Sequence, residues 1–355
     1  MAVFVAGIVA IVQFAFLALL LAFLVVRRFY DRRQRAAFLA GQGEVAIPLR
    51  AWLVGGAHPA PVVAVLRRLP PGTAVGYLAL LARQTIPDSN RDELADALRG
   101  EPWLEVAKRQ GTSRFWWRRL EAARALSLVA DARERAEVLA LFFDEHPAVQ
   151  IAAAGALSRV LDEAIVAQVL DRLDTLPKVV RHYVTTVLRR SRAIIGPSLA
   201  ARITAGGPFA PLAAWIELAE AIDDPEALTA ARLRADHPAT PVRRTIARAL
   251  RRFPGPESEA ALVRLLGDKD ASVRSAACRT LGELGSRGSV AALAPMLSDP
   301  IWLVRVRAAV SLAQLGERGR AALRTARAGE DRFARDMATM VTGLTEGAVL
   351  EMGDA

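Results

Sequence analysis

Arginine and aspartate recur at regular spacing in the C-terminal two thirds of the chain. A guanidinium group binds a carboxylate or phosphate through two parallel hydrogen bonds, so the series could form a ridge for an acidic partner. Alternatively, each arginine could bond a loop aspartate or carbonyl of its own or the next structural unit, as a ladder. The regular recurrence favours the ladder. Its predicted members are Asp144, Arg181, Arg243, Asp268, Arg274, Asp299 and Arg305.

Aromatic and arginine side chains also cluster where residues 115–119 read Phe-Trp-Trp-Arg-Arg, and another tryptophan lies in the equivalent stretch around residue 302. Such residues are typical anchors of protein interfaces. Packing between helices is the alternative, and both interpretations stay open. The candidate partner-binding residues are Trp116, Trp117, Arg118, Arg119 and Trp302.

Signatures of enzymes are missing from the sequence, which has no P-loop, no G-x-S-x-G and no H-E-x-x-H motif. Cys278 is the single cysteine, so an intrachain disulfide is excluded. It follows the core-facing Ala277, and we expect a packed side chain rather than a nucleophile. The four scattered histidines do not indicate a metal site. We therefore expect no catalytic residue, no metal, no cofactor and no enzymatic activity.

These side chains lie on an internal repeat. Its two clearest copies place Val273 and Val304 at the same position, which gives a period of 31 residues. Apolar or small residues follow each valine at offsets of 4, 8 and 11, which lie on one helical face. The same frame extends back to Arg118, giving seven units without an insertion. Each unit also holds an earlier helix, and such a short helix pair buries its apolar stripe only against neighbouring pairs. The predicted fold is all-α, an α-solenoid. Examples of the earlier helices are expected at 163–173, 257–266 and 289–297.

Residues 268–285 resemble the HEAT repeat in its short bacterial form, also called the phycobilisome-lyase HEAT-like repeat, through the pattern Asp-x-x-x-x-Val-Arg-x-x-Ala-Ala-x-x-Leu-Gly-x-Leu-Gly. The resemblance implies a right-handed superhelix of helix pairs that serves as a binding scaffold. A few members of this family are bilin lyases, so a HEAT-like lyase or other cofactor-handling enzyme is one alternative. Certain DNA glycosylases are also HEAT-like, so a nucleic-acid-binding solenoid is the second alternative. The resemblance is strong over 257–316, clear at 114–161 and 237–253, and degenerate at 176–222.

Residues 1–26 carry no charged side chain, and a helix of this length crosses a hydrocarbon core about 30 Å thick. No basic residue precedes the apolar run, which argues against a cleaved signal peptide. We predict one transmembrane helix over 1–26. Because arginines follow it at once, the positive-inside rule places the N-terminus outside and the C-terminal domain in the cytoplasm, at the bacterial inner membrane. These flanking residues are Arg27, Arg28, Arg32, Arg33 and Arg35.

The rest of the chain has a predicted order of segments and a diffuse charge. Hydrophobic residues make up 53% of the chain, which excludes a disordered protein. The net charge is +10, of which residues 27–35 contribute four, and the remainder is interleaved with acidic residues, which speaks against nucleic acid as the partner. The segments are a basic juxtamembrane linker at 27–43, a divergent helical cap, with room for worn repeats, at 44–111, HEAT-like repeats at 112–328, and a closing helix with a frayed tail at 329–355.

These features predict a membrane-anchored cytoplasmic scaffold that binds a protein partner at the inner membrane. The anchor would raise the effective concentration of the solenoid near a membrane-associated partner. The layout looks similar to bacterial accessory subunits that are encoded alongside membrane glycosyltransferases. That resemblance implies a glycosyltransferase or an envelope polysaccharide system as the partner.

Overall fold

The structure is a computed structural model that describes residues 47–48, 51–52, 59–83 and 88–354. The predicted transmembrane helix at 1–26, the linker at 27–43 and its five flanking arginines lie outside these residues. Within the described ranges the regular structure is helical throughout. None of the described helices combines the length and the apolar character that a bilayer span requires.

The second helix of each repeat begins exactly one period after the one before, from residue 116 to residue 302, as expected from the sequence. The anchor valines of these helices, such as Val242, Val273 and Val304, are completely buried. Proline in the first turn, as in Pro147 and Pro241, suits a helix start because that turn needs no donor from its amides. The helices are α6 (Trp116–Val129), α8 (Pro147–Val160), α10 (Lys178–Leu188), α12 (Phe209–Ile222), α14 (Thr240–Ala249), α16 (Ala271–Glu283) and α18 (Trp302–Gln314).

The chain forms two compact units, residues 1–160 and 161–355. In the first unit α6 packs against α3, α5 and α8. Trp52, Trp103 and Leu128 belong to one buried cluster, so the helices before the repeats share a core with the first repeat. The other helices of this unit are α2 (Ala60–Arg68), α3 (Pro71–Leu81), α4 (Asp88–Leu98), α5 (Pro102–Gly111) and α7 (Arg135–Phe142).

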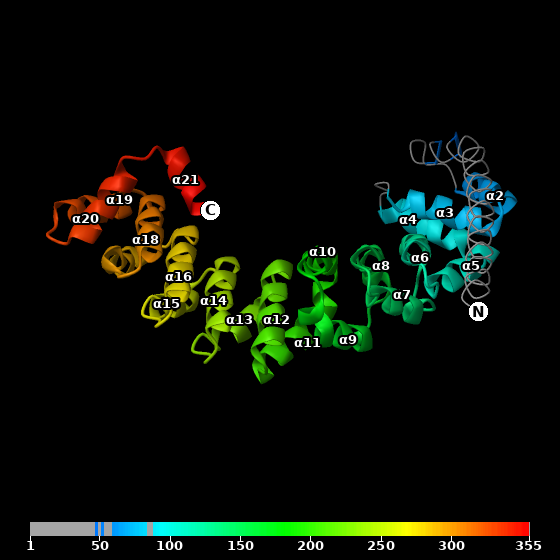
Figure 1. The fold of residues 1–355 in the computed structure, drawn as a ribbon, viewed down its shortest axis with the longest axis horizontal. Coiled ribbons are helices and arrows are strands. Elements are labelled where there is room, and N and C mark those ends of the chain that lie inside the picture. The colour runs from blue at the N-terminus through cyan, green and yellow to red at the C-terminus, as the bar shows by residue number, and fades with distance from the viewer. Residues whose placement is uncertain (1–46, 49–50, 53–58, 84–87, 355) are drawn as a thin grey trace, which may run out of the picture. The chain divides into compact units, whose positions relative to one another are not determined.

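The second unit has a layer of second helices, in which α12, α14, α16 and α18 each pack against the next, as Figure 1 shows. The expected first helix at 289–297 is broken: α17 spans only four residues, and 294–298 form a 3₁₀ turn. Pro295 explains the break, because it lacks an amide hydrogen and disfavours an α-helical residue before it. The first helices are α9 (Glu163–Arg172), α11 (Arg192–Ala205), α13 (Pro225–Arg232), α15 (Pro256–Leu265), α17 (Val290–Leu293) and α19 (Gly316–Ala328).

Two helices end the described chain. The predicted closing helix corresponds to α20 (Arg332–Thr342). The expected frayed tail is instead mostly helical, because α21 (Glu346–Asp354) packs against α18. Arg307 of α18 donates a hydrogen bond to the carbonyl oxygen of Met352 at 2.6 Å, which ties the end of the chain to the last complete repeat.

Bidentate ion pairs join consecutive repeats. The arginine that follows the anchor position donates through Nε and Nη2 to an aspartate in the loop of the next repeat. For Arg274 and Asp299 the two distances are 2.7 and 2.9 Å. Both side chains are largely buried, so each charge depends on the other for compensation. The same pairing, with the same separation along the chain, occurs in Arg119–Asp144 and Arg243–Asp268.

Each of these rungs also organises the loop of its own repeat. Arg274 donates through Nη1 to the carbonyl oxygen of Asp268, in the loop before α16, at 2.8 Å. Asp299 accepts the amide of Ile301 at 2.8 Å, just before α18 begins. The Asp268 carboxylate itself accepts hydrogen bonds from Arg243. Contacts to aspartate side chains and to main-chain carbonyls therefore alternate from residue 243 to residue 299.

The rung is incomplete at two of the predicted arginines. Arg181 donates to the carbonyl oxygen of Asp174, but Gly206 occupies the position of the rung aspartate in the next repeat and has no side chain. Arg305 donates to the carbonyl oxygens of Asp299 and Pro300, and the ring of Phe333 lies 4.5 Å from its guanidinium carbon. Burial opposes ionisation of Asp299, yet the hydrogen bonds from Arg274 and the Ile301 amide outweigh it, so the pKa of Asp299 is lowered.

Asp299→Asn should lower the free energy of unfolding at pH 7 by about 3 kcal/mol, because it leaves Arg274 buried without a counter-ion. Glu317→Gln, in an exposed ion pair that solvent screens, is the control and should change it little. Thermal unfolding and hydrogen exchange of α16 and α18 measure both. The lowered pKa means that Asp299 stabilises the fold above about pH 4, and this is lost as the pH falls through the folded-state pKa. The difference between wild type and Asp299→Asn should therefore shrink below pH 4; equal loss in both variants at pH 7 would contradict the ladder.

Cys278 should not react with a thiol reagent in the native protein. Its side chain is fully buried in α16, and burial, followed by the negative charge of Asp299, raises the pKa of its thiol to about 12. The reactive thiolate is therefore scarce near neutral pH. Titration with an aromatic disulfide at pH 7.5 should give one equivalent of thiol in 8 M urea and almost none without it. Rapid labelling of the folded chain would contradict this environment.

Candidate binding surface

The tryptophans at the start of α6 lie on the surface of the first unit. Trp116 and Trp117 are 41% and 40% exposed. Trp116 stacks in parallel on His146 with ring centroids 4.1 Å apart, and Trp117 stacks on Phe115 at 4.6 Å. Arg118 is exposed, with its guanidinium carbon 5.7 Å from the Phe115 ring. These aromatic rings are held in fixed positions before any partner arrives, which suits an interface anchor.

Arg119 differs from its expected place on a partner-binding surface. It is 9% exposed and forms the rung with Asp144, with a further bond to Glu145 at 3.0 Å. The physical reason is its register: Arg119 lies four repeat periods before Arg243 and so occupies the same lattice position. Its charge is used within the fold.

Trp302 begins α18 and is the most exposed of the candidate aromatic residues, at 56%. Ile301 and Leu303 on either side of it are also exposed, as is Phe333 near the start of α20. These side chains follow the loop that holds Asp299. Trp302 is therefore available to a partner, but no described aromatic side chain stacks on it as His146 does on Trp116.

A basic surface extends over α14, α16 and α18, and we call it the arginine groove. Arg244, Arg248 and Arg251 of α14 and the turn after it are spaced i, i+4 and i+7, so they share a helical face. Arg279 of α16 and Arg307 of α18 continue the surface over three consecutive repeats. The groove encloses about 240 Å³ and is further lined by Ser272, Ser275, Ala276, Thr280 and Glu283.

Positive charge exceeds negative charge in this groove. Glu220 accepts Arg251 at 2.6 Å, and Glu283 accepts Arg279 at 2.8 Å. Arg244 and Arg248 are exposed and make no ion pair or hydrogen bond with the described part of the chain. Burial lowers the pKa of Arg307, and repulsion from the nearby charge of Arg279 adds to this effect while Glu283 opposes it. An anionic group would relieve this repulsion.

Sequence reasoning missed the arginine groove, although part of its signal was present. Arg244, Arg248 and Arg251 alternate with the buried Val242, Ile246 and Leu250, so their common direction could be derived from the repeat frame. The contributions of Arg279 from α16 and Arg307 from α18 could not be derived in this way, because they depend on how far each side chain reaches toward the neighbouring helix. No group of three or more histidine, cysteine, aspartate or glutamate side chains with the geometry of a metal site occurs in the described residues.

Comparisons with known proteins agree with the helical-repeat architecture. Residues 225–313 and 259–342 match the family model for HEAT repeats. No curated protein matches the chain. The matched ranges contain the two ion-paired rungs and the arginine groove of the second unit.

Several solved structures match the chain at low identity and low TM-score. Human deoxyhypusine hydroxylase in complex with glycerol is 20% identical, with a TM-score of 0.28, over 82% of this chain and 98% of that one. The complex of CpcE and CpcF of phycocyanin lyase from Nostoc sp. PCC7120 is 20% identical, with a TM-score of 0.32, over 66% and 94%. Kap121p is 13% identical, with a TM-score of 0.36, over 85% and 43%.

These likenesses in fold carry no information on activity, and the assignment rests on the family match. The stacked helix pairs, with their valine anchors and arginine–aspartate rungs, are the structural form of that match. The chain therefore contains HEAT repeats, and the family match places them in residues 225–342.

Proposed function

We propose that the chain is a non-catalytic HEAT-repeat scaffold that binds an acidic segment of a protein partner in the arginine groove. The observation that carries this proposal is the pair of exposed arginines without counter-ions, Arg244 and Arg248, beside three further arginines from consecutive repeats. Guanidinium groups bind carboxylates with defined geometry, and the spacing along α14 matches acidic side chains one turn apart on a partner helix.

A protein partner suits the groove better than nucleic acid does. Glu283 lines the groove and Glu220 reaches its edge, so two carboxylates would face a phosphate backbone. The acidic side chains of a protein partner can be spaced so that they avoid these two glutamates. A phosphate backbone carries uniform negative charge and would meet both of them. The exposed tryptophans Trp116, Trp117 and Trp302 add interface anchors of the kind that protein partners use.

A scaffold also accounts for the residues better than the lyase alternative. The buried Cys278 has a thiol with a raised pKa, which does not suit a nucleophile. The arginine groove holds no histidine or cysteine to act as a base or nucleophile. Binding without chemistry needs only what the groove supplies, which is charge and shape.

The anchor predicted from the sequence gives the proposal its location. Residues 1–26 would hold the scaffold at the inner membrane, with the arginines of 27–35 on the cytoplasmic side. The partner is then membrane-associated, and the layout of anchor and solenoid supports an accessory subunit of a membrane glycosyltransferase or an envelope polysaccharide system. Confinement to a surface would replace part of the binding affinity that a freely diffusing scaffold needs.

The double variant Arg244→Glu/Arg248→Glu should lose at least tenfold of the partner recovered with the full-length chain from mild detergent, as quantified by mass spectrometry. Two carboxylates would then repel the acidic segment, while neither arginine supports the fold. Arg264→Glu/Arg318→Glu is the matched control, since it makes the same charge change at exposed arginines outside the groove. Equal losses in both variants would refute the groove, and recovery of nucleic acid whose binding falls steeply with salt would favour the alternative solenoid.

Deletion of residues 1–35 should abolish partner-dependent function in the cell, since it removes recruitment to the membrane. The expressed level and the melting temperature of the truncated chain are the controls, and neither should change greatly. Fusing an unrelated single-span anchor in the same orientation should restore function. Full function of the truncated chain without an anchor would refute recruitment while leaving binding by the groove intact.

A further inference from the structure

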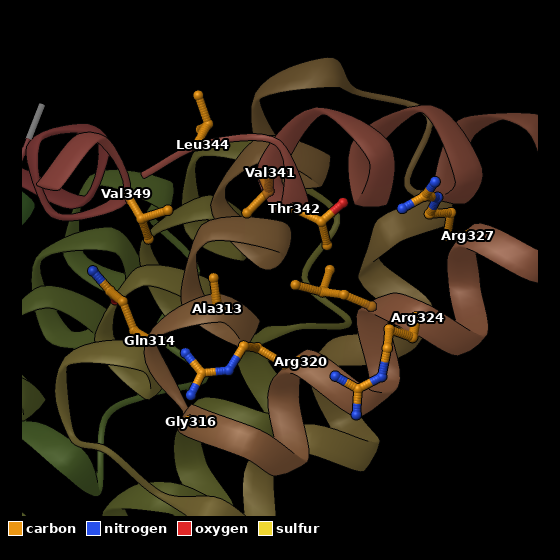
Figure 2. Close-up of a pocket in the computed structure, with 11 residues that line it drawn as sticks. Ala313, Gln314, Gly316, Arg320, Arg324, Arg327, Val341, Thr342, Leu344 and Val349 are labelled. Carbon is orange, nitrogen blue, oxygen red and sulfur yellow. The ribbon is translucent and has the colours of Figure 1, made fainter. Parts of the chain in front are cut away.

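A second cavity lies at the C-terminal end of the second unit, apart from the arginine groove. It has a volume of about 510 Å³ and is walled by the end of α18, by α19, by the end of α20 and by α21. Figure 2 shows Val341 and Thr342 of α20 facing Ala313, Arg320 and Arg324 across the cavity. This volume is within the range of sites that bind small molecules, about 300–1,000 Å³.

The floor of the cavity is apolar. Leu323 of α19, Val341 of α20 and Val349 of α21 line it and are 1%, 2% and 9% exposed. Leu344, in the turn between α20 and α21, adds a half-buried side chain. The helix that closes the cavity is α21, which Arg307 holds against α18. An apolar body placed on this floor would leave water without requiring any polar partner.

The rim of the cavity is cationic. Arg320, Arg324 and Arg327 follow the i, i+4, i+7 spacing of one face of α19, and none of the described side chains that line the cavity is acidic. Glu317 pairs with Arg324 at 2.5 Å and with Arg320 at 3.5 Å, but its side chain is 71% exposed. Arg327 makes no ion pair or hydrogen bond with any described residue. Arg327 is thus the cation of this rim that no carboxylate of the described chain neutralises.

We propose that this cavity binds a small anionic amphiphile, with its apolar body on Leu323, Val341 and Val349 and its carboxylate or phosphate head held by Arg327. The apolar floor and cationic rim together define this class. A neutral apolar molecule would not supply a counter-charge to Arg327. A small hydrophilic anion would leave the apolar floor in contact with water. The proposal is independent of a partner in the arginine groove, because the two sites share no lining residue.

The test uses the full-length chain in phosphatidylcholine nanodiscs and photoactivatable probes with a ten-carbon chain that carries a diazirine. One probe ends in a carboxylate, a second in a phosphate, and a third in a neutral alcohol. Mass spectrometry of proteolytic peptides locates the labelled residues. Both acidic probes should label residues 313–349 saturably and at least tenfold more than the alcohol does. The head group that labels at the lower concentration then distinguishes a fatty-acid ligand from a phospholipid-type ligand.

Arg327→Gln should reduce this labelling about tenfold at sub-saturating probe, which corresponds to the loss of one charge-assisted contact. Arg318→Gln is the matched control, since Arg318 is exposed on the same helix but does not line the cavity, and it should leave labelling unchanged. Thr342→Trp, at the exposed mouth, should reduce labelling by obstruction while the melting temperature stays unchanged.

Three results would overturn the proposal. Labelling by the alcohol at the level of the acids would show that the arginines select nothing. Equal losses in Arg327→Gln and Arg318→Gln would show a general effect of charge. Labelling spread evenly over the peptides of the chain would show partition from the bilayer rather than binding. None of these results bears on the arginine groove, so the two proposals fail separately.

Discussion

The bidentate contact between an arginine and the aspartate of the next repeat is the interaction on which the arrangement of α14, α16 and α18, and with it the arginine groove, depends. It removes two charges from water and is stable only with good geometry, so it fixes how one second helix sits against the next. Arg243 and Arg244 illustrate the consequence. The first is buried in a rung with Asp268, and the second, its neighbour in the chain, points into the arginine groove. The buried arginine thereby fixes the position from which its neighbour reaches the groove.

The repeat frame was predictable because anchors such as Val273 and Val304 recur without an insertion, and buried positions of that kind determine where helices lie. The bounds of the first helix within each repeat were less predictable, because a local effect such as that of Pro295 on α17 is not contained in the repeat frame. Helix α21 was missed because its sequence lacks strong periodicity. Its packing against α18 stabilises a helix that the sequence alone would form only weakly. The groove and the C-terminal cavity depend on side chains from three or four helices, which a linear pattern does not bring together.

Arginine serves three distinct purposes in this chain, and their environments separate them. Buried arginines such as Arg274 meet a carboxylate and main-chain oxygens. Arginines at the edge of a layer, such as Arg251, pair with one glutamate. A third set, including Arg248 and Arg327, has no counter-ion within the described residues. The net charge of +10 is therefore a poor guide to function, whereas the distribution of carboxylates around each arginine separates structural from binding positions.

The interruption of the ladder has a consequence for how the chain folds. Gln150, Arg181 and Leu212 occupy the rung position in three successive repeats, and none makes the bidentate pair that Arg243 and Arg274 make. In a linear array, stability is the sum of each repeat and its coupling to the next neighbour. The rungs from residue 243 to residue 299 therefore add a buried ionic contact to the helix packing that all repeats share. Opening one of these C-terminal repeats apart from its neighbour would expose an unpaired charge, a cost that the three repeats without the pair do not carry.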